Sequence, residues 1–280
     1  MNLYSIDTEL FKLDGGAMFG VVPKVLWSRT NPPDENNLCT WAMRLLLIED
    51  GDQLILVDTG LGDKQSEKFF GHYYIHGENT LDKSLAKHGF SRDDITDVFL
   101  THLHFDHVGG AIIRDGDQLV PAFKNAYYWS NAQHWKWATE PNDREKASFL
   151  SENILPIQES GRLKFVEDQD AGVLNKNISI RFAFGHTDAM MMPQIQYKDK
   201  TILYMADLLP SVGHIPLPYV MAYDMFPMKT LEERKNYWQE VADQEIICFL
   251  EHDPVNECCT MQHTEKGVRL KDTFSLDSIL

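Results

Sequence analysis

Four side chains that can bind a metal ion fall within six consecutive positions of this chain. They are His102, His104, Asp106 and His107. The segment 101–110 reads THLHFDHVGG and directly follows a short apolar strand predicted at Val98–Leu100. Alternation along an extended chain places the first three of these side chains on one side. Because only 11 of the 280 residues are histidine, such density is not expected by chance, and it predicts a metal site.

The residue types in this segment indicate which metal would bind. Imidazole and carboxylate together suit zinc or a similar divalent ion, and the lack of cysteine ligands argues against an iron–sulfur cluster or structural zinc. The alternative is a solvated or capping cluster of histidines. Several imidazoles this close would repel one another once protonated, so the metal site is the favoured interpretation.

Three further polar side chains stand where apolar strands end. They are His186, Asp207 and His252. The strands that they follow are predicted at Ile178–Phe184, Ile202–Ala206 and Ile246–Leu250. Strand ends at one edge of a sandwich converge on a shared cleft, so one site can collect all three. Taken singly, each fits equally well as a polar residue that ends a strand.

Composition limits the class of protein and its partners. With 43% hydrophobic and 24% charged residues, the chain is neither disordered, collagen-like nor a coiled coil. A formal net charge of −16 disfavours nucleic acid and anionic membrane as partners. The longest apolar stretch, Leu45–Ile48, is too short for a membrane span. Four cysteines without a CxxC motif predict reduced thiols and a cytoplasmic location.

Strand and helix signals alternate along two similar halves. The predicted hairpin joins Met43–Ile48 to Leu54–Val57, and the predicted helices cover Thr80–His88, much of 131–153, and a segment from a Thr230/Glu233 capping box to Asp243. Strands with intervening helices predict an α/β fold in which two mixed sheets are flanked by helices. We expect a single domain over residues 1–280.

The motifs together resemble a known family. THLHFDHVGG, the upstream Asp58-Thr59-Gly60 and the three downstream ligands are similar to the metallo-β-lactamase superfamily over nearly the whole chain. Within it, the segments Leu13–Trp27 and His214–Glu233 most resemble the quorum-quenching N-acyl homoserine lactonases. The resemblance implies an αββα sandwich with two divalent metal ions per chain, expected to be zinc, at one sheet edge.

The resemblance also implies a role for each ligand. His102, His104 and His186 would hold the first metal, Asp106, His107 and His252 the second, and Asp207 would bridge both. A hydroxide between two such metals would open the lactone ring, with Asp106 passing a proton to the leaving alkoxide. The motif is specific for fold and metal rather than for substrate, so a hydrolase of another ester, a thioester or an organophosphate is the alternative.

One position departs from the pattern of the relatives. Many relatives carry a tyrosine three residues after the bridging aspartate, where it contacts the substrate carbonyl, and this chain has Pro210 there. His214 is the nearest replacement, and we expect it to act with Asp106 as a catalytic residue. A purely structural histidine is the open alternative.

Apolar side chains are expected to bind the acyl chain of an acylated lactone. They are Met18, Phe19, Val25 and Phe69. The alternative is that they pack in the core or at a dimer contact, which leaves a homodimer open. Neither nucleic acid nor membrane is expected as a partner.

Overall fold

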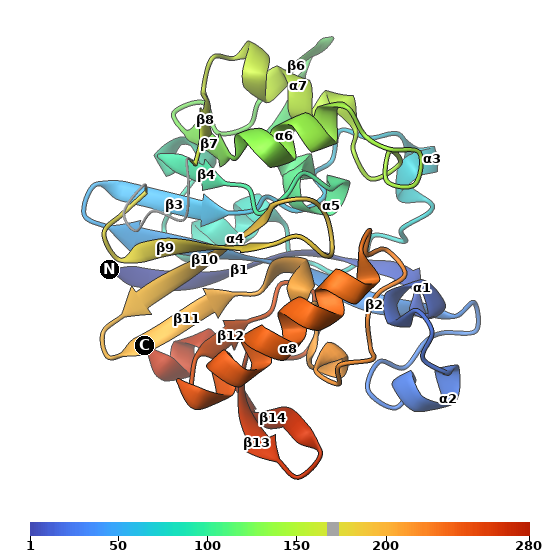
Figure 1. Cartoon of the computed structure of the whole chain (residues 1–280). Helices are drawn as coiled ribbons and strands as arrows, with labels where there is room; N and C mark the ends of the chain where they lie inside the picture. Colours follow the sequence, from blue (N-terminus) through green and yellow to red (C-terminus); the bar gives the residue numbers. More distant parts are fainter. Residues whose placement is uncertain (167–173) are drawn as a thin grey trace. The chain divides into compact units, whose positions relative to one another are not determined.

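Two six-stranded mixed sheets dominate the computed structural model, which describes residues 1–166 and 174–280 (Figure 1). The first sheet has the order β1 (Asn2–Asp14), β2 (Leu38–Asp50), β3 (Gln53–Val57), β4 (Asp97–Phe99), β7 (Tyr127–Ser130), β8 (Leu163–Phe165). The second has the order β14 (Gly267–Phe274), β13 (Cys258–Thr264), β12 (Ile247–Phe249), β11 (Lys200–Tyr204), β10 (Met190–Tyr197), β9 (Ile178–Ala183). A small ribbon pairs β5 (Ile112–Asp115) with β6 (Gln118–Pro121).

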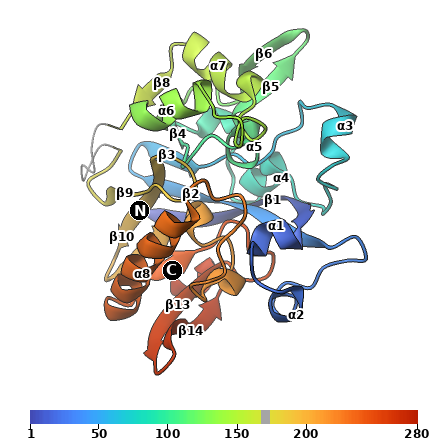
Figure 2. The ribbon, with the colours of Figure 1, turned by 45° about the vertical axis from the view of Figure 1, so that its right-hand side comes forward.

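Helices flank both sheets, as the predicted fold class requires. They are α1 (Gly15–Phe19), α2 (Lys24–Trp27), α3 (Glu67–Phe70), α4 (Leu81–Lys87), α5 (Phe105–Val108), α6 (Ala132–Thr139), α7 (Ser151–Glu159) and α8 (Pro227–Asp243). Two mixed sheets with flanking helices confirm the predicted class. The longest helix, α8, packs against β13 and β14 of the second sheet (Figure 2).

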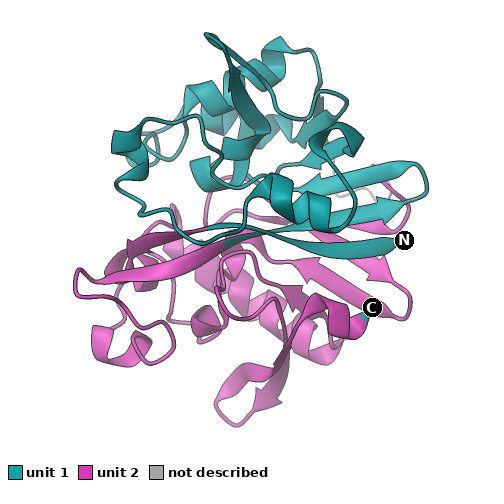
Figure 3. Cartoon of the chain, turned by 180° about the vertical axis from the view of Figure 1, so that it is seen from behind, with its two compact units in different colours: residues 1–9, 43–170, 280 teal, residues 10–42, 171–279 magenta. Residues whose placement is uncertain are grey.

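The chain divides into two compact units. Unit 1 comprises residues 1–9, 43–170 and 280, and unit 2 comprises residues 10–42 and 171–279 (Figure 3). Neither unit is continuous in sequence, because the long strands β1 and β2 each belong partly to both. The expectation of a single domain over the whole chain stays a prediction.

Parallel pairing sets the functional edge of the sheet in unit 1. β3 and β4 are parallel, with Val57 opposite Phe99, so both strands end at the same edge. Asp58 follows the first strand directly, and the segment beginning at Thr101 follows the second. Both strands are fully apolar at these ends and buried, as expected for parallel strands that are covered on both faces.

Parallel strands also bring polar residues to one sheet edge in unit 2. β11 and β12 are parallel, with Tyr204 opposite Phe249, and Asp207 and His252 follow their ends. β9 is antiparallel to β10, which is antiparallel to β11, so β9 also runs towards that edge and delivers His186 there. The three polar residues that follow predicted strands therefore do share an edge within this unit.

Most local predictions are confirmed, and one is wrong. β2 and β3 form the expected hairpin, with Asp50 opposite Gln53, and Thr80 caps α4 by accepting from the Lys83 N–H at 3.3 Å. The Thr230/Glu233 capping box is wrong: α8 begins at Pro227, one turn earlier. A proline at the first helical position needs no N–H partner and starts the helix, which releases Glu233 for other contacts.

Other segments differ in detail. The helical stretch expected within 131–153 is two helices, α6 and α7, separated by a loop. The strands that the sequence analysis did not predict are β1, β5, β6, β7, β8, β13 and β14. All four cysteines are free and buried, in agreement with the predicted thiols. Among the described residues, none of the helices combines the length and the apolar character needed to cross a membrane.

Candidate metal centre

Asp58 organises the metal-binding segment of unit 1. Its Oδ1 accepts the Thr101 backbone N–H at 2.8 Å, and its Oδ2 accepts the Thr101 hydroxyl at 2.6 Å and His107 Nδ1–H at 3.1 Å. The residue is fully buried and holds a φ of 59°, a left-handed conformation that aspartate tolerates better than most residues. One carboxylate thus fixes the start of the segment and one of its imidazoles.

Hydrogen bonds orient His102 and His104 towards each other. The Thr101 hydroxyl, which donates to Asp58, accepts from His102 Nδ1 at 3.1 Å, and Glu145 Oε1 accepts from His104 Nε2 at 2.9 Å. The other nitrogen of each imidazole could then bind a metal ion. These two nitrogens, His102 Nε2 and His104 Nδ1, lie 3.1 Å apart. A tetrahedral zinc ion at its usual bond length would hold two nitrogens about 3.3 Å apart.

Asp106 and His107 form a second pair in the same unit. His107 Nδ1 donates to Asp58, so Nε2 is the ring nitrogen that could bind a metal ion, and it lies 3.9 Å from Asp106 Oδ2. Both residues are buried in the short helix α5. A carboxylate oxygen and an imidazole nitrogen at this spacing suit a second divalent ion.

The backbone behind this pair is fixed by close packing. A Cβ at Gly109 would collide with the Leu61 carbonyl, so only glycine lets the loop after Asp58 approach the loop after His107. The Lys64 ammonium donates to the Gly109 carbonyl at 2.5 Å. Burial of this amine lowers its pKa to about 8. The loop 58–64 therefore holds the C-terminal side of the metal-binding segment in place.

Unit 2 carries the complementary set, centred on Asp207. Its two carboxylate oxygens face different imidazoles: Oδ2 lies 3.1 Å from His186 Nε2, and Oδ1 lies 3.0 Å from His252 Nε2. The opposite nitrogen of each ring is held, His186 Nδ1 by Asp224 at 2.8 Å and His252 Nδ1 by the Ala42 carbonyl at 2.7 Å. This is the arrangement needed for one carboxylate to serve two metals.

The charge state of His186 is consistent with a cation site. Burial lowers the pKa of this imidazole, but the Asp207 and Asp224 carboxylates raise it more, and the result is a pKa of about 10. Without a metal, the ring carries a proton between two carboxylates. A metal ion would replace that proton on Nε2, because metal ligation requires the neutral imidazole.

The donor set fits divalent metal ions. Within each unit, buried imidazole nitrogens lie 3.0–3.9 Å from another imidazole nitrogen or from a carboxylate oxygen, so a bound metal ion could take the place of protons in these contacts. Each ring is also fixed by a partner on its far side, as is usual for metal-bound histidine. The predicted ligands of unit 1 lie together, and so do those of unit 2.

His214 occupies a packed interior position in unit 2. Its Nε2–H donates to the Met18 carbonyl at 2.9 Å, and its Nδ1 accepts from the Ser211 hydroxyl at 2.9 Å. The ring stacks on Phe19, with centroids 4.4 Å apart and planes at 8°. Burial lowers its pKa to about 3, so the ring is neutral. The catalytic role stays a prediction, and these contacts favour the structural alternative.

The variant His214→Ala separates the two roles. We expect a lower melting temperature, because the change opens a cavity beside Phe19 and leaves the Met18 carbonyl without its donor, at a cost of about 2–4 kcal/mol. Metal content and kcat of the folded variant should match the wild type. A kcat lowered about 10–10³-fold at an unchanged melting temperature would instead establish a catalytic donor.

The four predicted substrate contacts differ in exposure. Met18 and Phe19 in α1 are buried, whereas Val25 in α2 is 66% exposed. In unit 1, Phe69 is half-buried and packs edge-on against Phe105, with centroids 5.4 Å apart. Because Phe105 precedes Asp106, Phe69 lies beside the candidate ligand pair Asp106 and His107. Substrate binding by these residues stays a prediction.

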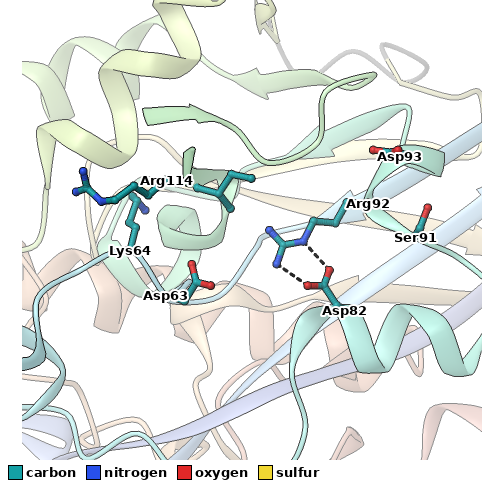
Figure 4. A pocket seen from close by; sticks show the side chains of 8 residues that line it. Asp63, Lys64, Asp82, Ser91, Arg92, Asp93 and Arg114 are labelled. Atoms are coloured by element: carbon teal, nitrogen blue, oxygen red, sulfur yellow. Dashed lines mark hydrogen bonds and ion pairs between the residues drawn. The ribbon is translucent and has the colours of Figure 1, made fainter. Parts of the chain in front are cut away.

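A separate cavity of about 640 Å³ in unit 1 is lined by charged side chains (Figure 4). Its lining includes Lys64, Arg114 and the Arg92–Asp82 ion pair, in which Arg92 Nε lies 2.6 Å from Asp82 Oδ1. None of the predicted metal ligands lines it. Its lining mixes acidic and basic side chains, unlike the histidine-rich groups described above.

Several orienting groups carried no sequence signal. Glu145, Asp224 and the Ala42 carbonyl each fix a ligand from a segment far away in sequence, and His134 Nε2 accepts the Leu103 backbone N–H at 2.9 Å. His134 lies in a helix whose sequence gives no sign of this role. Only Asp58, at the end of an apolar strand, was marked by its DTG motif.

Comparison with known proteins agrees with this geometry. Residues 45–243 match the family model of the Metallo-beta-lactamase superfamily. An N-acyl homoserine lactonase from Bacillus thuringiensis is 34% identical over 84 residues, which are 26% of this chain and 32% of the relative. The matches to curated relatives span only about a quarter to a third of those proteins' length.

Solved structures match over almost the whole chain. A probable metal-dependent hydrolase from Staphylococcus aureus is 26% identical, with a TM-score of 0.86 over 98% of both chains. AidC, a dizinc quorum-quenching lactonase solved with N-hexanoyl-L-homoserine as product, is 23% identical, with a TM-score of 0.80 over 98% of this chain and 95% of AidC. The fold is therefore the one expected from the sequence motifs. The family model covers most of the chain, and the chain belongs to the metallo-beta-lactamase superfamily.

Proposed function

We propose that this protein is a dinuclear metal hydrolase that opens the lactone ring of N-acyl homoserine lactones. In the proposed centre, His102, His104 and His186 hold one ion, and Asp106, His107 and His252 hold the other. Asp207 bridges the two ions. Zinc is the proposed metal, because imidazole and carboxylate donors without thiolate suit it.

The observation that carries this proposal is the two-sided Asp207 carboxylate. Each of its oxygens faces a different imidazole at 3.0–3.1 Å, and each imidazole is fixed from behind. A mononuclear site would need only one such oxygen. The two separate pairs in unit 1, at 3.1 and 3.9 Å, supply the matching number of further ligands for two ions.

When bound, a pair of divalent ions supplies Lewis-acid polarisation of the substrate carbonyl and lowers the pKa of water. The protein's own groups orient the reaction. Asp106, which has one oxygen towards His107, would hold the proton and deliver it to the leaving alkoxide. Asp58 and Glu145 each hold one nitrogen of an imidazole, so that the opposite nitrogen of His107 or His104 would bind the metal ion.

An aromatic cluster beside Asp106 supports an acylated substrate. The Tyr73 ring lies 4.7 Å from that of Phe105 and 5.0 Å from that of Phe69. Burial and the nearby Asp106 charge raise the pKa of Tyr73 to about 12, so its phenol keeps its proton. This wall offers apolar surface for an acyl chain and one hydroxyl donor for its amide or carbonyl oxygen.

The likeness to N-acyl homoserine lactonases favours the lactone among the possible esters. The alternative is a hydrolase of another ester, a thioester or an organophosphate, which the same metal centre would equally serve. We place the enzyme in the cytoplasm on the strength of its four free, buried thiols.

A substrate panel tests the proposal. Zinc-loaded protein should open N-acyl homoserine lactones, with a kcat/KM at least about tenfold above those for a simple aryl ester, a thioester and a phosphotriester, because about 1.4 kcal/mol of selective binding suffices. The ring-opened acyl homoserine should appear as product. Faster turnover of the aryl ester, the thioester or the phosphotriester, with lactones left intact, would show that the lactone is not the substrate.

A further inference from the structure

Helix α8 contacts both ligand-bearing loops of unit 2 through adjacent side chains. The Glu233 carboxylate accepts the backbone N–H groups of Phe184 and Gly185, at 2.7 and 3.0 Å, immediately before His186. A Cβ at Gly185 would collide with Thr230, so the loop lies directly on the first turns of the helix. Glu233 thus fixes the backbone that carries one metal ligand.

The next residue, Arg234, reaches the loop that follows Asp207. Its Nε donates to the Leu208 carbonyl at 2.9 Å, and its Nη1 donates to the Tyr219 carbonyl at 2.7 Å and the His214 carbonyl at 3.4 Å. Leu208 is the neighbour of Asp207 in the chain. A single planar group therefore joins the start, middle and end of the loop 208–219.

The contribution of Arg234 to the stability of the fold does not explain why an arginine occupies this buried position. Its side chain is fully buried, its three acceptors are neutral carbonyls, and none of the ion pairs within the described part of the chain includes it. Burial lowers the pKa of the guanidinium to about 10, which the Asp224 and Asp207 carboxylates partly offset. A buried charge without a contacting counter-charge is unfavourable, and an apolar side chain of similar size is often as stable.

We propose that Arg234 is a positioning residue for the metal centre, and that with Glu233 it sets the spacing between the bridging Asp207 and His186. The inference rests on the proposed dinuclear site. Glu233 fixes the backbone before His186, and Arg234 fixes the backbone after Asp207. Because the two anchors are neighbours on one helix, the same rigid element holds the backbone next to both ligands.

Trp238 supplies a matched control. It lies one turn further along α8, is buried, and donates its indole N–H to the Ile215 carbonyl of the same loop at 2.7 Å. Its contact is with the middle of the loop, away from Asp207. Trp238→Phe therefore removes a buried loop hydrogen bond but keeps an aromatic ring beside the Arg234 guanidinium, which lies 5.9 Å from the centre of the Trp238 ring. Lys235→Met changes a neighbouring exposed charge on the helix.

The test is zinc affinity, measured by competition with a chelator, together with melting temperature for each metal-free variant. Arg234→Met should weaken binding of at least one zinc ion about 10–100-fold, the loss typical of groups that orient metal ligands. Arg234→Lys should recover only part of that loss, because its donors lie on a single nitrogen, whereas Arg234 reaches the three carbonyls through Nε and Nη1. Trp238→Phe and Lys235→Met should bind zinc within about threefold of the wild type, even where Trp238→Phe melts earlier.

Two results would overturn the inference. One is wild-type zinc affinity in a folded Arg234→Met variant, and the other is an equal loss of affinity in Arg234→Met and Trp238→Phe at equal loss of stability. Failure of the wild type itself to bind two zinc ions would refute the proposed function instead. The wild-type titration thus separates the two failures.

Discussion

Asp207→Ala is expected to lower lactone turnover by at least about 10²-fold and to release at least one metal ion. The two oxygens of this carboxylate face His186 and His252 at 3.1 and 3.0 Å, so its removal takes a ligand from both proposed ions at once. Turnover and metal content, measured on the same purified sample, check the expectation.

The variant Asp207→Asn refines this test. The amide keeps the shape of the side chain but retains only one acceptor oxygen, so we expect one ion to remain and the other to be lost. Asp199→Ala, at an 88% exposed side chain in the same unit, serves as the control and should change neither property. Near-normal turnover with both ions present in Asp207→Ala would show that another group forms the bridge.

Asp58→Asn is expected to have the second largest effect, a loss of about 10–100-fold in metal affinity or activity. In the wild type, Asp58 Oδ2 accepts from both the Thr101 hydroxyl and His107 Nδ1–H. An amide NH₂ in that place is itself a donor, so His107 would have to accept at Nδ1 and carry its proton on Nε2. That tautomer cannot bind a metal through Nε2.

Asp97→Asn is the matched control for this variant. Asp97 is also a buried aspartate of unit 1, and it accepts from Trp129 Nε1 and the Thr96 hydroxyl, both at 2.8 Å. Loss of the Asp97 carboxylate in this variant should lower the melting temperature without changing zinc affinity. If Asp58→Asn lowered stability by the same amount and left zinc affinity intact, Asp58 would be a structural residue only.

The candidate ligands could be placed because they are local to strand ends. His102, Asp207 and His252 follow short apolar strands, as does the orienting residue Asp58, and parallel pairing brings each pair of strand ends to one edge. Such a pattern needs no knowledge of distant contacts. The dense run from His102 to His107 then indicates the chemistry.

The groups that orient these ligands could not be predicted in the same way. Glu145 and Asp224 lie 41 and 38 residues from the histidines that they hold, in segments without periodicity or motif. The Ala42 carbonyl lies 210 residues from His252. Their roles depend on how loops pack against the sheet, and nothing in their local sequence records it.

The error at α8 has an instructive cause. Thr230 followed by Glu233 satisfies the capping-box pattern, but Pro227 starts the helix earlier, and Glu233 accepts from Phe184 and Gly185 instead. The carboxylate still satisfies backbone N–H groups, but those groups belong to another segment. The residues of a local capping motif thus make a tertiary contact instead of capping the helix. The same ambiguity applied to His214, whose two hydrogen bonds reach Met18 and Ser211.

The most direct test of the proposed centre is the number of metal ions per chain at full activity. Protein stripped of metal should regain lactone turnover as zinc is added, and elemental analysis at saturation should give close to two ions per chain. Seven ligands that include a two-sided carboxylate are too many for one tetrahedral ion. Full activity with a single tightly held ion per chain would contradict the account.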